Sequence, residues 1–257
     1  MKFTLATAGF IAMTLVASLC SAQDDPAAKD LVKKMLDAAP KQTSQGKGSL
    51  SSNRGWTRDL NVYHKYVNGV ESVYMEVTAP GDVAGTRFLM KDKQEGPDEQ
   101  YIYIPAAKRT IKVSEETRKQ PFLGSDFFIL DLVKPDLDAY DYSFVGEEEI
   151  NGRKTKLVQA VPKNPEGELY GKTVVAIDPQ DLVVVREQFF DKKNQLYKVL
   201  TVKKLEKVDG VWTPLEQEMA DVQGKTSSLL KVTDVKYGVE LPDGMFERQY
   251  MTQERGG

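Results

Sequence analysis

Apolar and polar residues alternate over much of the chain, a period of two that is typical of strands with one buried face. Within residues 72–79, Val73, Met75 and Val77 are separated by more polar neighbours. Comparable runs cover residues 58–66, 86–91, 100–104, 109–113, 142–147, 154–161, 172–177, 183–191, 196–204, 213–221 and 227–237. The pattern predicts about eleven strands.

Short turns between these runs predict antiparallel pairing. Asn-Gly occurs at 68–69 and 151–152, and Asp-Gly occurs at 209–210. These residues accept the positive φ angles of tight hairpin turns. Strands in hairpin order with few helices predict a mainly β (α+β) fold, in which a single curled antiparallel sheet forms a half-barrel. We expect residues 23–257 to form one such domain, and its inner face must be covered.

One segment expected to cover the sheet is an amphipathic helix over residues 27–39. Leu31 and Met35 lie one turn apart on its apolar side. Pro26 suits the first turn of the helix, and Pro40 ends it.

A second covering segment is expected at residues 122–132, hereafter the insert, with the sequence FLGSDFFILDL. Its Gly-Ser-Asp turn offers an N-cap, and the apolar residues that follow predict a short helix. By contrast, residues 42–53 are polar and rich in Gly and Ser. We expect them to form a loop or the ragged start of a strand.

The amino terminus has the three parts of a secretory signal. Lys2 supplies a positive charge, residues 3–19 are apolar, and the small residues 20–22 precede a cleavage site after Ala22. We therefore expect residues 1–22 to be a cleaved signal peptide and the mature protein to lie in the periplasm. Lipidation at Cys20 is the alternative, although Leu19 is larger than the residue that usually precedes a lipidated cysteine.

Charge and reactive residues narrow the function classes. The formal net charge is −3, with basic and acidic residues interspersed, which argues against a nucleic-acid partner. His64 is the only histidine, and no Gly-x-Ser-x-Gly motif, phosphate loop or calcium loop occurs. We expect no catalytic residues, no metal and no cofactor. An envelope hydrolase that uses His64 is the least favoured hypothesis.

Apolar and aromatic residues are in excess in the central third of the chain. In the run 100–104, Tyr101 and Tyr103 alternate with Ile102 and Ile104, so both faces of this strand are apolar. A strand that is apolar on both faces is covered on both faces. A gap between a covering helix and the sheet would be an apolar cavity.

Three blocks of sequence carry a resemblance to a known family. They are AGTRFLMK at 84–91, QYIYIPAAKR at 100–109 and FLGSDF at 122–127. In this order, the blocks resemble the outer-membrane lipoprotein-sorting-like family, relatives of the LolA/LolB-type carriers. The chain departs from the family after Phe127, where FILDL replaces an acidic-aromatic stretch that ends in Glu-Asp-Leu.

The resemblance implies a half-barrel whose concave face is covered by helices and holds acyl chains in an apolar cavity. It also implies a role in lipid or lipoprotein traffic, in some relatives beside exporters of the resistance-nodulation-division type. Lys108 and Arg109 are candidates for contact with an anionic headgroup or an acidic partner. The candidate cavity residues come from the insert and the strands expected to face it: Phe88, Met90, Tyr101, Tyr103, Phe122, Phe127, Phe128 and Leu130.

Two main functional hypotheses follow. The first is a monomeric, non-catalytic periplasmic carrier that moves lipid or an acylated protein between membranes, with an inner-membrane exporter or an outer-membrane acceptor as its partner. Each methylene that a lipid buries in its membrane stabilises the lipid there by about 0.8 kcal/mol. Movement between membranes therefore requires a protein cavity that keeps the acyl chain away from water. The second is an accessory module that docks on an envelope transporter or outer-membrane assembly without carrying lipid.

Overall fold

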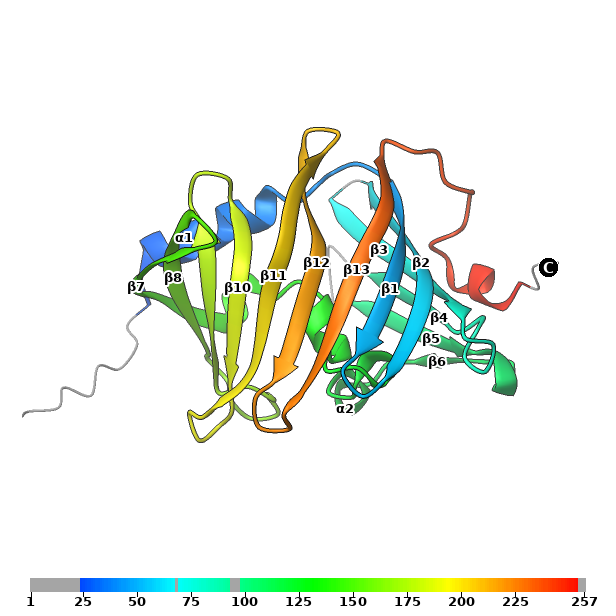
Figure 1. Ribbon diagram of the computed structural model, residues 1–257, viewed down its shortest axis with the longest axis horizontal. Helices are drawn as coiled ribbons and strands as arrows, with labels where there is room; N and C mark the ends of the chain where they lie inside the picture. The colour runs from blue at the N-terminus through cyan, green and yellow to red at the C-terminus, as the bar shows by residue number, and fades with distance from the viewer. Residues whose placement is uncertain (1–23, 68, 93–97, 254–257) are drawn as a thin grey trace, which may run out of the picture.

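The computed structural model describes residues 24–67, 69–92 and 98–253, and within them the main feature is one antiparallel sheet of thirteen strands (Figure 1). The predicted signal peptide and Cys20 lie outside the described residues. The strands are β1 (Ser44–Ser52), β2 (Trp56–Val67), β3 (Val70–Ala79), β4 (Arg87–Lys91), β5 (Glu99–Ile104), β6 (Arg109–Lys112), β7 (Tyr140–Ile150), β8 (Arg153–Pro162), β9 (Lys172–Asp178), β10 (Val183–Phe190), β11 (Leu196–Val208), β12 (Val211–Asp221) and β13 (Thr226–Tyr237).

The strand order is β6-β5-β4-β3-β2-β1-β13-β12-β11-β10-β9-β8-β7. Sequence neighbours therefore pair within each half, and β1 joins the halves by pairing with β13. The edge strands β6 and β7 lie at opposite ends of the curved sheet and do not close it (Figure 1). The mainly β fold with a single antiparallel sheet is confirmed, whereas the count of about eleven strands is wrong for the described residues.

Two of the predicted hairpin turns have the expected backbone. Asn151 and Gly152 have φ angles of 52° and 76° between β7 and β8. Asp209 and Gly210 have φ angles of 51° and 83° between β11 and β12. Positive φ at both central positions matches the right-handed twist of the paired strands.

Strand β1 is the strand that the alternation of apolar residues does not predict. Most of its residues are polar, and only Gly48 and Leu50 are buried. It forms because β2 and β13 pair with it on both sides. A Cβ atom at Gly48 would lie 3.0 Å from Cγ of Leu60, so glycine permits the close approach of β1 and β2.

Helix α1 (Pro26–Asp37) forms where the amphipathic pattern predicts it. The carboxylate of Asp25 caps it by accepting a hydrogen bond from the backbone N–H of Ala27. Its apolar side packs against the β7 end of the sheet, in a cluster with Tyr142, Val158 and Ile177. Within the described ranges, no helix is long and apolar enough to span a bilayer.

The insert contains separate short turns in place of the predicted helix. Leu123 and Gly124 have positive φ angles of 52° and 72°, which reverse the chain. The N–H of Phe122 then donates to the carbonyl oxygen of Phe127 at 2.7 Å. Only two 3-10 turns remain in the insert, η2 (Phe122–Gly124) and η3 (Ile129–Leu132). The predicted cover of two helices is therefore not confirmed.

The other short elements among the described residues connect β5 to β6, flank the insert or lie near the carboxyl end. They are η1 (Pro105–Ala107), α2 (Glu115–Arg118), η4 (Leu137–Ala139) and η5 (Arg248–Thr252). The segment between β6 and β7, hereafter the covering segment, includes α2, the insert and η4. It lies on the same side of the sheet as α1 (Figure 1). This side is called the inner face below.

Both faces of β3–β5 are covered, as the two-sided apolar pattern of strand 100–104 predicts. Ile102 packs against the inner cluster that contains Phe88 and Phe122. On the outer face, Tyr101 and Tyr103 pack against a cluster that includes Met245, Phe246 and Met251. The outer cover is the chain segment after β13, drawn in red in Figure 1.

Candidate functional site

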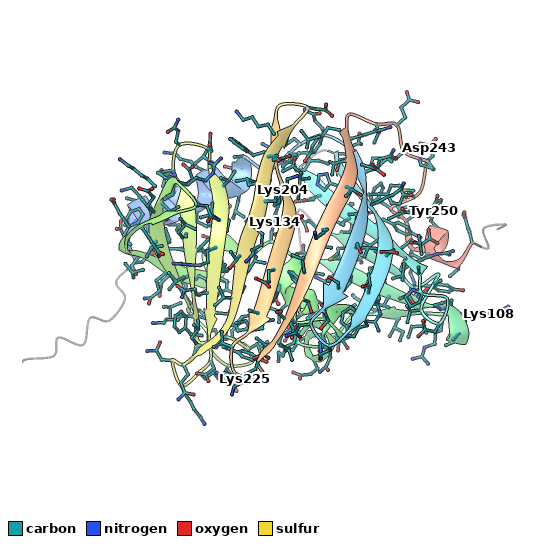
Figure 2. The ribbon with its side chains drawn as sticks, viewed as in Figure 1. Lys108, Lys134, Lys204, Lys225, Asp243 and Tyr250 are labelled. Carbon is teal, nitrogen blue, oxygen red and sulfur yellow. The ribbon has the colours of Figure 1, made fainter. Side chains whose placement is uncertain are left out.

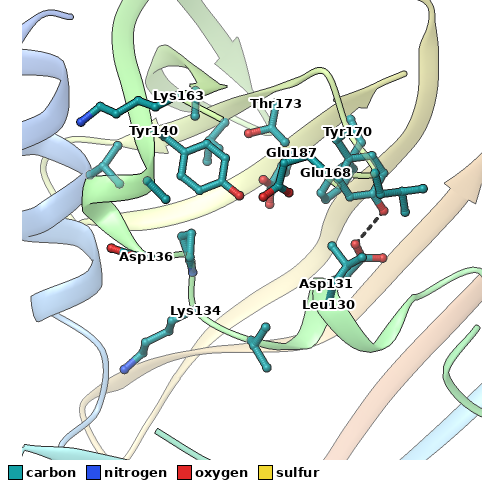
Figure 3. A pocket seen from close by; sticks show the side chains of 18 of the residues that line it. Leu130, Asp131, Lys134, Asp136, Tyr140, Lys163, Glu168, Tyr170, Thr173 and Glu187 are labelled. Atoms are coloured by element: carbon teal, nitrogen blue, oxygen red, sulfur yellow. Dashed lines mark hydrogen bonds between the residues drawn. The ribbon is translucent and has the colours of Figure 1, made fainter. Parts of the chain in front are cut away.

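A cavity of about 630 Å³, hereafter the main cavity, lies between α1, residues 115–140 and the inner face of β7–β10 (Figure 3). This volume lies within the range of about 300–1,000 Å³ that is common for ligand sites. Its apolar lining consists of Val32 and Met35 from α1, Leu130 and Val133 from the covering segment, and Tyr142, Val158, Ala160, Val175, Val184 and Phe189 from the sheet.

Charged side chains surround the apolar lining. Arg118, Lys119, Lys134 and Lys163 line the main cavity together with Glu115, Asp136, Glu166 and Glu168. Several of these cations have partners: Lys119 forms an ion pair with Glu116 at 2.8 Å, and Lys134 forms one with Glu71. The cavity is therefore amphipathic, with apolar walls and a charged rim.

Side chains from three elements meet beside the cavity-lining residues Asp131 and Tyr170. Lys198 from β11 lies 2.6 Å from the carboxylate of Asp131, and each side chain is 1 % exposed. The hydroxyl of Tyr170 donates to the other carboxylate oxygen of Asp131 at 2.7 Å. Burial lowers the pKa of Lys198, and the negative charge of Asp131 opposes this effect.

Glu187 from β10 also lines the main cavity. Its pKa is raised to about 7, first by burial and then by the negative charge of Asp131. A hydrogen bond from Thr173 acts in the opposite direction. Figure 3 shows Glu187 between Tyr140 and Tyr170, with Thr173 beside it.

The insert is anchored to the sheet at two points. Lys198 Nζ donates to the carbonyl oxygen of Asp126 at 2.8 Å, and it lies 3.7 Å from the ring centroid of Phe128. The carboxylate of Asp126 accepts hydrogen bonds from Thr226 and Ser228, both at 2.5 Å. Buried polar groups paired in this way specify one position for the insert, because any displacement would leave charges unpaired.

A second cavity of about 280 Å³ lies on the other side of the insert. Apolar residues dominate its lining, which comes from the insert and from β1–β3, β12 and β13. They include Leu50, Leu60, Val62, Met75, Phe122, Phe127, Leu132, Leu230 and Val232. The insert thus contributes to both cavities.

The residues predicted for an apolar site fall in several places. Phe122 and Phe127 line the second cavity, and Leu130 lines the main cavity. Phe88 and Met90 are buried in the inner cluster, where the ring centroids of Phe88 and Phe122 are 4.5 Å apart. Phe128 packs against Lys198 and Tyr197.

The remaining predicted site residues lie away from both cavity linings. Tyr101 and Tyr103 face the outer cluster. Lys108 follows η1 with a φ angle of 46°, at the end of the sheet opposite α1 (Figure 2). Arg109 is exposed on the edge strand β6.

The sequence analysis missed most of the main cavity, because its sheet lining comes from β7–β10 and the predictions centred on the middle third of the chain. One signal was available. In β10, Glu187 shares a strand face with Phe189, since side chains two residues apart point the same way. A carboxylate on an apolar face indicates either a paired core charge or a ligand-facing group.

His64 has partners on both ring nitrogens. Nε2 lies 2.8 Å from a carboxylate oxygen of Glu71, and Nδ1 lies 3.1 Å from the carbonyl oxygen of Gln42. These two contacts connect β2 to β3 and to Gln42 in the segment before β1. Among the described residues, no group of three or more His, Cys, Asp or Glu side chains could hold a metal ion.

A protein-family model that is described only as an uncharacterized protein matches residues 69–253. No curated protein matches the chain. Among solved structures, the chain is similar to a DUF1329 family protein from Desulfovibrio piger, with 27% sequence identity and a TM-score of 0.82. The similarity covers 89% of this chain and 99% of that chain.

Two further solved structures share the fold at lower identity. One is described as an outer membrane lipoprotein-sorting protein domain from Vibrio parahaemolyticus, with 23% identity, a TM-score of 0.81 and coverage of 88% of this chain and 99% of that chain. The other is a LolA superfamily protein from Nitrosomonas europaea, with 15% identity, a TM-score of 0.64 and coverage of 87% and 98%.

Proposed function

This chain belongs to the family whose model matches residues 69–253, and from the fold that it shares with a lipoprotein-sorting protein domain and a LolA superfamily protein we propose that it is a carrier of lipid or lipid-anchored cargo in the bacterial envelope. The fold shared with these two proteins confirms the resemblance carried by the three sequence blocks. The proposed carrier is non-catalytic: it binds an amphiphile, shields the acyl part from water and releases it unchanged.

The observation that carries the proposal is the amphipathic main cavity. Its apolar walls are formed by α1, the covering segment and the sheet, and charged side chains form its rim. An acyl chain in contact with those walls would gain about 0.8 kcal/mol for each buried methylene. The charged rim suits a polar headgroup, which keeps its hydration or forms ion pairs there.

The second cavity extends the space available to cargo. Because the insert contributes Leu130 to one cavity and Phe127 to the other, cargo in either cavity would contact the insert. We place acyl chains against these two residues and against Val158, Ala160 and Val175 of the sheet. Phe88 and Met90 belong to the buried cluster that packs against the insert, with Phe88 in contact with Phe122.

Location and partners are part of the same proposal. A signal peptide at residues 1–22 would export the chain to the periplasm, where residues 23–257 would act as a monomeric domain. Donor and acceptor would be envelope components, such as an inner-membrane exporter and an outer-membrane acceptor. Lys108 and Arg109, at the end of the sheet away from the main cavity, are proposed to contact an acidic partner.

Lipid uptake by the delipidated protein tests the proposal. The protein is incubated with vesicles that contain phosphatidylethanolamine, phosphatidylglycerol and a phospholipid with a fluorescent acyl chain. It is then separated from the vesicles and examined by native mass spectrometry. A carrier acquires a discrete added mass together with the fluorescence. Protein that remains without lipid contradicts the proposal.

A matched pair of variants locates the lipid. Val175→Trp fills the main cavity and is expected to reduce uptake by about tenfold. Val174→Trp is the control, because the adjacent side chain of β9 points to the opposite face of the sheet. Equal uptake by the two folded variants would place the lipid outside the main cavity.

The docking module is the second candidate function, and one observation favours it. Phe144 is 36 % exposed and Val145 is 48 % exposed on the edge strand β7. An edge strand with exposed apolar side chains can accept a strand from another chain. If the delipidated protein takes up no amphiphile, an envelope partner at β7 becomes the better proposal, and Phe144→Lys should weaken its binding.

A further inference from the structure

Glu187 contributes a carboxylate to the lining of the main cavity. It lies on β10, beside the apolar cavity residue Phe189. Among the described residues, its one hydrogen-bonding partner is the hydroxyl of Thr173. No lysine or arginine in the described part of the chain forms an ion pair with it.

The charges that act on Glu187 are those of Asp131 and Lys198, and together with the Glu187 carboxylate they leave one net negative charge. Lys198 is the cation that acts on Glu187, but its Nζ is already engaged by Asp131 at 2.6 Å and by the carbonyl oxygen of Asp126. Glu168 adds a further carboxylate at the rim beside Glu187 (Figure 3). Because Lys198 is already paired with Asp131, the cavity wall at Glu187 suits a bound cation.

Tyr142 supplies an independent observation at the same cavity. Its side chain is buried, with 2 % of the residue exposed. Its phenolic oxygen has no hydrogen-bond partner among the described residues. A buried hydroxyl without a partner has a cost of about 1–3 kcal/mol, which a bound polar group would remove.

Aromatic rings complete the surroundings. The ring centroids of Tyr140 and Tyr142 are 6.4 Å apart on β7, and those of Tyr170 and Phe189 are 4.8 Å apart across the cavity wall. Aromatic faces beside a carboxylate form the combination that recognises alkylammonium groups. The phenolic oxygen of Tyr142 can also accept a hydrogen bond from an ammonium N–H.

We propose that the main cavity selects amphiphiles that carry an amine, whose ammonium group binds between the Glu187 carboxylate and the rings of Tyr140 and Tyr142. This inference rests on the proposed carrier function and adds the chemical class of the cargo. The acyl part would lie along the apolar walls formed by α1 and β8–β9. An amphiphile with a carboxylate in the same position would face like charges and bind more weakly.

The test uses three probes with the same ten-carbon chain: decylamine, decanol and decanoate. Each is titrated by calorimetry into the delipidated full-length protein at about pH 8, where Glu187 is ionised and the amine is protonated. Decylamine is expected to bind at least about tenfold more tightly than decanol, and decanoate more weakly than decanol. Glu187→Gln should reduce the affinity for decylamine to that for decanol.

Glu206→Gln is the matched control, since this glutamate on β11 is exposed and forms its ion pair with Lys204. It should leave the order of the three affinities unchanged. Thermal unfolding of each variant confirms that it is folded. The cavity-filling variant Val175→Trp should weaken binding of all three probes.

The possible outcomes are distinguishable. Equal affinities for decylamine and decanol, unchanged in Glu187→Gln, would overturn the inference and leave the carrier function intact. Preference for decanoate that is lost in Arg118→Gln would also overturn it and assign the headgroup to the rim guanidinium. Failure of all three probes to bind would overturn both the inference and the proposed function.

Discussion

The ammonium group of Lys198 and the carboxylate of Asp131 lie 2.6 Å apart, with each side chain 1 % exposed. Lys198 belongs to the sheet, and Asp131 belongs to the insert. Removal of one partner from such a buried pair leaves the other charge without compensation, which typically has a cost of about 3–5 kcal/mol. This contact therefore links the position of the insert, and the boundary between the two cavities, to the stability of the fold.

We expect Asp131→Asn to lower the free energy of unfolding by about 3 kcal/mol. The amide can no longer balance the charge of Lys198, and it is a weaker acceptor for the Tyr170 hydroxyl. Urea denaturation followed by tryptophan fluorescence measures the change. Asp37→Asn is the control, because Asp37 forms an exposed ion pair with Lys33 on α1. A decrease as small in Asp131→Asn as in this control would contradict the anchoring role.

The stability of the protein should depend on pH through Glu187. Its pKa rises from an ordinary value of 4.5 to about 7 in the folded protein. Between these values the folded state holds more protons than the unfolded state, so the free energy of unfolding falls as pH rises through this window. The groups that act on Glu187 are Asp131 of the insert, Thr173 of β9 and Lys198 of β11. Glu187 in turn raises the pKa of Tyr140 on β7 and of Tyr170 between β8 and β9.

Glu187→Gln should remove this dependence. Relative to the unaltered protein, the variant should gain stability on the order of 2 kcal/mol between about pH 4.5 and about pH 7. Chemical denaturation at several pH values measures the difference. Asp92, whose pKa is raised to about 6, mainly by burial, is present in both proteins and cancels in the comparison. A constant difference across the window would show that Glu187 is not buried as a carboxylate.

Much of the sheet could be predicted from the sequence, because a strand with one buried face leaves a period of two in the residues themselves. The hairpin turns at 151–152 and 209–210 were predictable for a similar reason, since their positive φ angles favour Asn, Asp and Gly. The insert was harder. Its apolar residues suggested a helix, but the reversal at Leu123 and Gly124 and the buried contacts of Asp126 and Asp131 depend on partners far away in the chain.

The candidate site could be predicted only in its covering segment. Leu130 and Phe127 came from an apolar run that stands out locally. The opposite wall comes from β7–β10, where Val158, Val175 and Phe189 look like ordinary core residues. Whether such a residue fills a core or lines a cavity depends on how elements from both ends of the chain pack together. That packing cannot be predicted from the local sequence.

The outer cover of β3–β5 makes a separate prediction. Arg87 donates from Nη1 to the carbonyl oxygens of Met251 and Gln253, at 2.7 and 2.9 Å, and from Nε to Glu76 at 2.9 Å. Arg87→Met removes these donors, so the segment after β13 should detach more often. Limited proteolysis is expected to cleave this segment faster in the variant. Cleavage at an unchanged rate would mean that apolar contacts of Met245 and Met251 alone hold the segment.

Strand β1 provides the most direct test of how a polar sequence is kept in the middle of the sheet. Because a Cβ atom at Gly48 would lie 3.0 Å from Cγ of Leu60, Gly48→Val should force β1 and β2 apart. The expected loss is about 1–3 kcal/mol of unfolding free energy, the usual range for an overpacked core. Ser49→Val is the matched control on the opposite face of the same strand, where β-branched residues favour extended backbone. Equal destabilisation by Ser49→Val and Gly48→Val would show that any apolar residue on β1 is unfavourable. The limited space at Gly48 would then not explain how this polar strand holds the two halves of the sheet together.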